Sequence, residues 1–215
     1  MVLKTLTVTL LFAMGAAAAQ PLPELRIEPV TGGSIFYVKN VGTEPVTAFL
    51  IELVNYPGSY YSMWQDDAAG DLIAPGVEKR IPVNNMTVGA VPDYVKLQAA
   101  LFADGSSAGI AEKITQIVER RRFVLGTIRE AISRIEKGQA ASTPKATVVA
   151  DFKQWGDSLR PPARANRTAQ TTINQTAAAG IVGDAVAWLD SHSLDETLAK
   201  LRAGERSLAA SKPAL

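Results

Sequence analysis

The chain has 215 residues, with 22 lysines and arginines, 21 aspartates and glutamates, one histidine and no cysteine. A formal charge of +1 gives no electrostatic reason to expect binding to nucleic acid. The absence of cysteine excludes disulfides, thiol catalysis and cysteine-ligated metals, and a single histidine excludes a histidine-rich metal site, so we expect no cofactor.

Residues 1–19 have the three-part pattern of a cleavable secretory signal peptide. Lys4 gives a positive start, an apolar run extends from Leu6 to Ala19, and small residues end this run before Gln20. The run is shorter than the ~20 residues that a membrane-spanning helix needs. Cleavage after Ala19 also removes Lys4, which leaves as many basic as acidic residues. We expect a periplasmic or secreted protein without a stable membrane span.

Residues 20–109 are predicted to form an antiparallel β-sandwich. Short runs of β-branched and aromatic residues alternate with turn signals, as in residues 34–39 before the Asn-Val-Gly turn at 40–42. Several short strands at regular spacing are typical of a sandwich. Residues 94–102 form one of the apolar runs. Strict alternation along this run predicts one shared face for Val95, Leu97, Ala99 and Leu101.

From residue 110 to residue 138 the apolar period changes to three and four residues, which predicts a long amphipathic helix over residues 111–137. Gly138 suits the C-terminal cap of this helix. The charged face includes three consecutive arginines at 120–122. We expect this run to be a solvated face paired with glutamates, although it could also bind an acidic ligand. Arg121 lies nearest the apolar stripe, with its stem expected to be buried.

The last third of the chain is predicted to be helical. A linker at residues 139–147 precedes a helical region at 148–210, and residues 211–215 are expected to fray. Ser193 and Glu196 match a capping box at the start of the final helix. The predicted fold class is therefore α+β, with an N-terminal antiparallel β-sandwich, a long amphipathic helix and a helical C-terminal region.

Two segments resemble a group of uncharacterised exported bacterial proteins with an Ig-like or fibronectin-III-like sandwich followed by a helix. Residues 38–49 contain an Asn-x-Gly turn that leads into a buried strand. Residues 95–109 are similar to the last hairpin of these proteins, where a Phe-x-Asp-Gly-Ser-x-x-Gly turn passes into an arginine-rich helix, here at residues 119–122. The resemblance covers residues 25–137. It implies an Ig-like sandwich and an envelope location, and it implies no activity.

An aromatic cluster gives the candidate ligand-binding residues, which are Tyr56, Tyr60, Tyr61 and Trp64. Exposed rings of this kind stack on sugars or anchor a protein partner. The alternative is that Tyr60 or Trp64 folds back and closes one end of the sandwich.

An acidic cluster follows directly and gives the candidate metal ligands, which are Asp66, Asp67 and Asp71. Hard cations such as calcium prefer several carboxylate oxygens on a flexible loop. The spacing does not match an EF-hand loop, and the alternative is a solvated turn between strands.

We therefore expect a non-enzymatic protein that presents residues 56–71 to an envelope protein or a glycan. One alternative is a hydrolase that acts on a glycan or peptide through Asp66, Asp67 or Asp71. A concave pocket that holds these acids together with the aromatic rings would favour it. The single histidine, His192, lies in a turn, and no Gly-x-Ser-x-Gly elbow indicates a nucleophilic triad. The other alternative is a homo-oligomer in which helices over residues 111–137 pair between copies.

Overall fold

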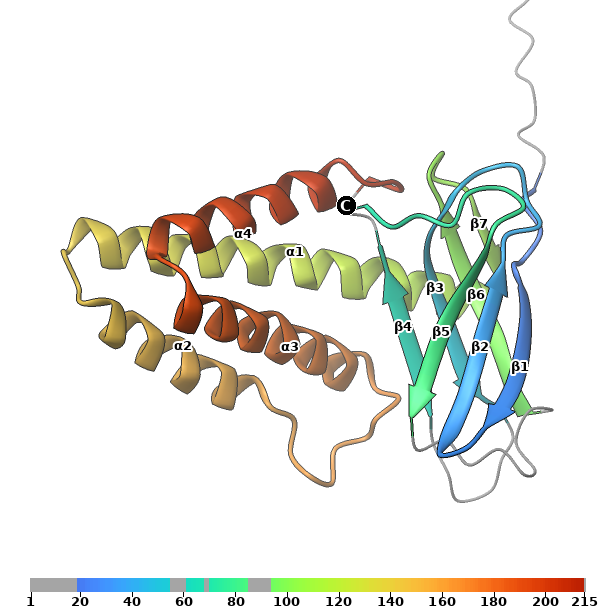
Figure 1. Cartoon of the computed structure of the whole chain (residues 1–215), viewed down its shortest axis with the longest axis horizontal. Coiled ribbons are helices and arrows are strands. Elements are labelled where there is room, and N and C mark those ends of the chain that lie inside the picture. Colours follow the sequence, from blue (N-terminus) through green and yellow to red (C-terminus); the bar gives the residue numbers. More distant parts are fainter. Residues whose placement is uncertain (1–18, 55–60, 68–69, 85–93, 215) are drawn as a thin grey trace, which may run out of the picture.

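The computed structural model describes residues 19–54, 61–67, 70–84 and 94–214. In this part of the chain the fold is α+β, with two antiparallel sheets followed by four helices (Figure 1). This agrees with the predicted fold class. The expected signal peptide lies outside the described residues except for Ala19.

Each sheet is built from strands that pair antiparallel with their neighbours. The three-stranded sheet has the order β1-β2-β5, with β1 at Glu24–Val30, β2 at Gly33–Lys39 and β5 at Glu78–Asn84. The four-stranded sheet has the order β4-β3-β6-β7, with β4 at Ser62–Asp66, β3 at Val46–Leu53, β6 at Val95–Phe102 and β7 at Ser107–Gly109.

Two irregularities interrupt the pairing of β3 with β6. The register shifts leave Thr47 on β3 and Gln98 on β6 as extra residues, as in β-bulges. Each extra residue reverses the alternation of the side chains beyond it. Leu97 therefore faces the core between the sheets, whereas Ala99 faces the opposite side. The expectation of one shared face is wrong for the set Val95, Leu97, Ala99 and Leu101.

The core between the two sheets is aromatic and aliphatic. Phe36 on β2, Phe49 on β3 and Phe102 on β6 are buried almost completely. Burial of each such side chain contributes roughly 1.5–3 kcal/mol to stability. The ring of Tyr61 packs edge-on against Phe36, with 6.2 Å between the ring centroids.

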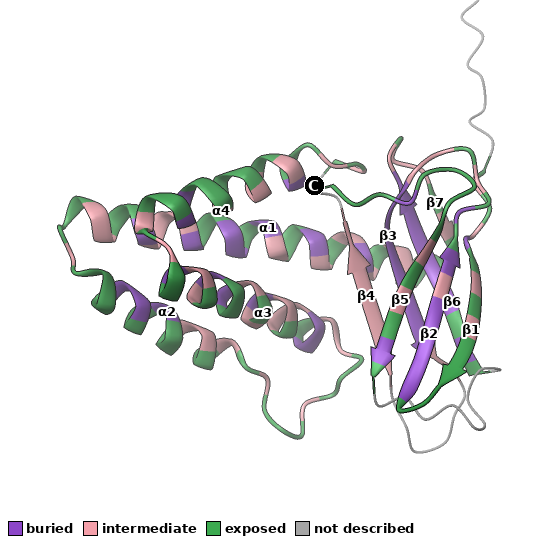
Figure 2. Cartoon of the chain, in the orientation of Figure 1, coloured by how far each residue is buried: buried purple, intermediate pink, exposed green. Residues whose placement is uncertain are grey.

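The first helix, α1 at Ala111–Ala140, connects the sandwich to the helical part of the molecule. Its first half lies on the outer face of the four-stranded sheet, where Ile117 is buried against a cluster that includes Leu50 and Leu101. Figure 2 shows buried positions recurring along α1 between exposed ones. The predicted amphipathic helix is therefore present, and its apolar stripe is covered by the same chain.

The second half of α1 forms a bundle with α2 at Lys145–Leu159, α3 at Gln170–Ser191 and α4 at Leu194–Ala209. Ile135 and Phe152 lie in its core and are fully buried. The predicted capping box of Ser193 and Glu196 at the start of α4 is confirmed. Among the described residues, no helix is both long and apolar enough to cross a membrane.

The turn between α1 and α2 differs from the sequence prediction. Gly138 lies inside α1 and does not cap it, and the left-handed conformation falls instead on Ser142, with a φ of 52°. A Cβ atom on Gly138 would lie 2.9 Å from Val148 Cγ2, so glycine here permits the close approach of α2. The non-helical stretch spans residues 141–144, which is shorter than the expected linker at 139–147.

Two glycines of α1 should respond oppositely to alanine. Around Gly126 no atom lies within 4 Å of an added Cβ, so Gly126→Ala is expected to raise the free energy of unfolding by about 1 kcal/mol through helix propensity. Gly138→Ala should lower it, because the new methyl group collides with Val148. Urea unfolding of both variants is the measurement. An equal gain from both would contradict the close packing of α1 on α2.

Candidate functional site

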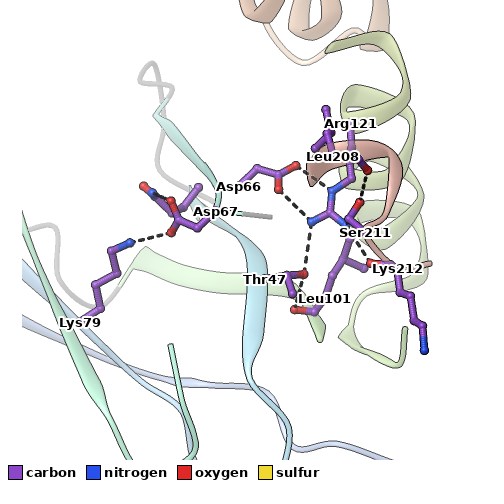
Figure 3. Close-up of polar contacts among 10 residues, drawn as sticks. Thr47, Asp66, Asp67, Lys79, Leu101, Arg121, Leu208, Ser211 and Lys212 are labelled. Carbon is purple, nitrogen blue, oxygen red and sulfur yellow. Dashed lines mark hydrogen bonds and ion pairs between the residues drawn. The ribbon is translucent and has the colours of Figure 1, made fainter. Parts of the chain in front are cut away.

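Asp66, the last residue of β4, and Asp67, which follows it directly, point to opposite sides of the strand (Figure 3). Successive side chains of a strand alternate between its two faces. The carboxylate of Asp66 points towards α1, and that of Asp67 points towards β5. The alternation of side chains along β4 and into Asp67 therefore separates two groups that the sequence predicts to act together.

Asp66 forms a two-pronged ion pair with Arg121 of α1. Arg121 Nε and Nη2 donate to the two carboxylate oxygens at 2.9 and 2.8 Å. Nη2 also donates to Thr47 Oγ1 at 3.2 Å, and Nη1 donates to the Lys212 carbonyl oxygen at 2.8 Å and to Ser211 Oγ at 3.4 Å. All five N–H donors of the guanidinium group thus have an acceptor. The Arg121 side chain is 0% exposed and that of Asp66 is 11% exposed.

The arginine run at 120–122 was expected to be a solvated face. The structure shows instead that its three side chains differ in exposure. Arg122 is exposed, Arg120 is half-buried and Arg121 is fully buried. Arg121 lies four residues after Ile117 and four before Leu125, both of which are buried, so it belongs to the apolar stripe of α1. The four-residue spacing to these two apolar residues is the feature of the sequence that could have predicted the burial of Arg121. Ser211 and Lys212, expected to belong to a frayed tail, are held by the same guanidinium group.

Asp67 and Asp71 share a different cation. Lys79 Nζ lies 2.6 Å from Asp67 Oδ2 and 3.0 Å from Asp71 Oδ2. Burial alone lowers the pKa of Lys79, but the hydrogen bonds and charges of Asp67 and Asp71 outweigh burial and raise it. The three candidate metal ligands are thus divided between Arg121 and Lys79. Within the described ranges, no three His, Asp or Glu side chains gather closely enough to hold a metal ion.

The candidate aromatic residues also separate. Tyr56 and Tyr60 lie outside the described residues. Tyr61 packs against the core of the sandwich, and burial raises its pKa to about 12. Trp64 packs on the outer face of the four-stranded sheet beside α1, so it does not close an end of the sandwich. Its indole Nε1 donates to Ser62 Oγ at 3.2 Å.

Trp64 lines a cleft between β4 and the loop that joins α2 to α3, which passes beside this strand (Figure 1). The cleft has a volume of about 430 Å³. An aromatic ring and two prolines supply apolar surface, three hydroxyl groups supply polar surface, and none of the described lining residues is acidic. The lining residues are Ser62, Trp64, Pro161, Pro162, Ala163, Ala165, Arg167, Thr172, Ile173 and Thr176. Sequence reasoning found Trp64 but not the residues of the opposite wall, which lie about a hundred residues further along the chain.

The single histidine is built into the turn between α3 and α4. The His192 ring stacks on Trp188 with 3.7 Å between centroids, and its Nδ1 lies 2.8 Å from Ser191 Oγ. Among the described residues, no carboxylate is hydrogen bonded to this ring. The contacts match the expected turn histidine.

Comparisons with models of known protein families, with curated proteins and with solved structures find no match for this chain. The function must therefore be argued from the site alone.

The pairing of Arg121 with Asp66 should be energetically strong. A double-mutant cycle with Arg121→Ala and Asp66→Ala is expected to give a coupling of about 2 kcal/mol or more, because each single change leaves a buried charge without its partner. The matched control is the pair Arg129–Glu205, which also joins two elements at 2.9 Å but has side chains 57% and 28% exposed. Its coupling should be below ~1 kcal/mol. Equal couplings in urea unfolding would contradict this assignment.

The partly buried side chain of Tyr61 predicts a loss of stability at high pH. Unfolded tyrosine ionises near pH 10, whereas Tyr61 in the folded protein ionises at about pH 12. Between these values the unfolded state releases a proton that the folded state retains, so the free energy of unfolding falls as pH rises. Tyr61→Phe should remove the contribution of this residue to the fall of the free energy of unfolding with pH. Identical slopes for the variant and the parent in urea unfolding between pH 9.5 and 12 would rule this out.

Proposed function

We propose that the protein is an exported, non-enzymatic binding protein of the cell envelope, and that the cleft beside β4 holds a protein segment or a glycan. The observation that carries this proposal is the position of Trp64 in a cleft that combines apolar rings with hydroxyl groups. Ligand sites are concave, mostly apolar and equipped with a few polar groups that orient the ligand. The extracytoplasmic location rests on the signal-peptide pattern of residues 1–19.

The arrangement of the carboxylates favours binding over hydrolysis. A hydrolase of the kind considered above would place Asp66, Asp67 or Asp71 in the pocket with the aromatic ring. These carboxylates instead pair with Arg121 and Lys79, and none of them lines the cleft.

The order of the strands supports an Ig-like sandwich, which we propose as the finer description of the fold. If β1, β2 and β5 are taken as strands A, B and E, then β3, β6 and β7 correspond to C, F and G. The strand β4 then lies beside strand C, as strand C′ does in variable-type domains. This arrangement agrees with the resemblance seen over residues 25–137.

The covering of α1 argues against a homo-oligomer through residues 111–137. Ile117, Leu125 and Ile135 are buried against other elements of their own chain. The apolar stripe that would pair between copies is therefore occupied within one copy.

A single-tryptophan protein tests the proposed site. Trp155→Phe with Trp188→Phe leaves Trp64 as the only tryptophan, since the chain has three. The protein from residue 20 onward would be screened against a glycan array and a phage-displayed library of linear peptides. Hits would then be titrated by Trp64 emission, and isothermal titration calorimetry would give the affinities of variants without Trp64. We expect a hit that shifts this emission and that Trp64→Ala weakens about 30-fold, which corresponds to ~2 kcal/mol for an aromatic anchor.

The matched control is Trp188→Ala in the otherwise unchanged protein, which alters a partly buried tryptophan of the bundle and should leave the affinity measured by calorimetry unchanged. The free energy of unfolding of Trp64→Ala would be measured alongside. A screen without hits, or hits that bind Trp64→Ala as tightly as the parent, would contradict the proposal.

A further inference from the structure

We propose that the cleft binds an extended peptide segment carrying an acidic side chain, which adds a strand to β4 and pairs with the main chain of Trp64. This inference rests on the proposed function and names the class of ligand for the same site. Addition of a strand to a sheet edge is a recurring mode of peptide recognition, in which main-chain hydrogen bonds supply affinity and side-chain pockets supply specificity.

The pairing of β4 with β3 fixes where the main chain of Trp64 points. The Tyr61 carbonyl oxygen accepts from Leu53 N–H at 3.0 Å, and Asp67 N–H donates to the Thr47 carbonyl oxygen at 2.8 Å. Main-chain groups of successive strand residues point alternately to the two sides. Met63 and Gln65 therefore direct their N–H and C=O groups towards β3, and those of Trp64 point away from it.

This outward side is an open edge of the sheet. The strand β4 is the last strand of the order β4-β3-β6-β7, so no strand of that sheet pairs beyond it. Trp64 itself lines the cleft, and its N–H and C=O have no hydrogen-bond partner among the described residues. One residue of an extended peptide can satisfy both groups at once, as in a hydrogen-bonded antiparallel pair.

The other three sheet edges carry features that oppose strand addition. Natural edge strands are protected by charges, by proline or by short length. The strand β1 has alternating charges and Pro29, β5 has three consecutive charged residues and Pro82, and β7 is only three residues long. By contrast, β4 has no proline, and its one charged residue, Asp66, is paired with Arg121. It is the least protected edge of the described sheets.

The charges around the cleft favour an acidic side chain on the peptide. Arg167 lines the cleft, and no described lining residue is acidic. The guanidinium carbon of Arg120 lies 5.8 Å from the centroid of the Trp64 ring, and Arg120 forms no ion pair with a described residue. Burial lowers the pKa of Arg120, an effect that the charge of Asp66 partly offsets. A ligand carboxylate would compensate this partly buried positive charge.

A glycan would use the same cleft differently. It could stack on the Trp64 ring and bind the hydroxyl groups, but it has no repeating main chain of alternate donors and acceptors. The two ligand classes therefore predict different behaviour of the Trp64 amide.

Amide hydrogen exchange measured by NMR makes the distinction. The probe is a linear peptide selected from the phage-displayed library on the protein from residue 20 onward. In the free protein we expect the Trp64 amide to exchange much faster than those of Met63 and Gln65, which point towards β3. In the complex the Trp64 amide should be protected about 10-fold or more beyond the free protein, with the other two unchanged. Single N-methylation along the peptide should abolish binding at alternate residues only.

A charge test accompanies this measurement. Amidation of the acidic side chain of the peptide should weaken binding about 10-fold in the parent protein, through loss of a charge-assisted contact, and have little effect in Arg120→Gln. The matched control, Arg122→Gln, changes an exposed residue and should behave as the parent. Equal effects of amidation in the parent and in Arg120→Gln would overturn the assigned role of Arg120.

The outcomes separate this inference from the proposed function. A peptide that binds through the Trp64 ring without protecting the Trp64 amide would overturn strand addition and leave a binding cleft. A cleft that binds only glycans would do the same. If neither class of ligand depends on Trp64, both the inference and the proposed function fail.

Discussion

A guanidinium group that has lost all contact with water needs a hydrogen-bond acceptor for each of its five N–H groups, because an unpaired buried charge is very costly. For Arg121 these acceptors come from β3, β4 and the residues that follow α4 (Figure 3). They meet at one point only when α1 lies across the outer face of the four-stranded sheet. The requirement of one buried charge therefore sets the position of the helical part relative to the sandwich.

The cleft is a consequence of the same placement. Because α1 is held against the sheet by Arg121 and by the cluster around Ile117, its second half extends away and supports α2 and α3. The loop between α2 and α3 then returns to the edge of β4 and forms the wall opposite Trp64 (Figure 1). Asp66 and Trp64 lie on the same strand, so the carboxylate that pairs with Arg121 is two positions from the residue proposed to bind the ligand.

The α+β class, the long helix and the capping box at Ser193 follow from local patterns, and these parts of the structure were predictable. The bulges at Thr47 and Gln98 were not, because they are defined by the pairing of two strands that are distant in the sequence. The burial of Arg121 depends on the acceptors that face α1, which only the tertiary structure supplies. The division of the acidic cluster would have followed from the alternation of side chains if residues 62–66 had been recognised as a strand. Trp64 was identified as a candidate from its chemistry, but the opposite wall of its cleft lies in a loop without a recognisable motif.

The central claim is that Arg121 joins the sandwich and the helical bundle into one cooperative unit. Differential scanning calorimetry of the protein from residue 20 onward and of Arg121→Ala tests it most directly. We predict a single transition for the parent, with equal calorimetric and van't Hoff enthalpies, and two separate transitions for the variant as the sandwich and the bundle unfold independently. A single transition with equal enthalpies in Arg121→Ala would show that the remaining contacts suffice for cooperativity and would contradict the claim.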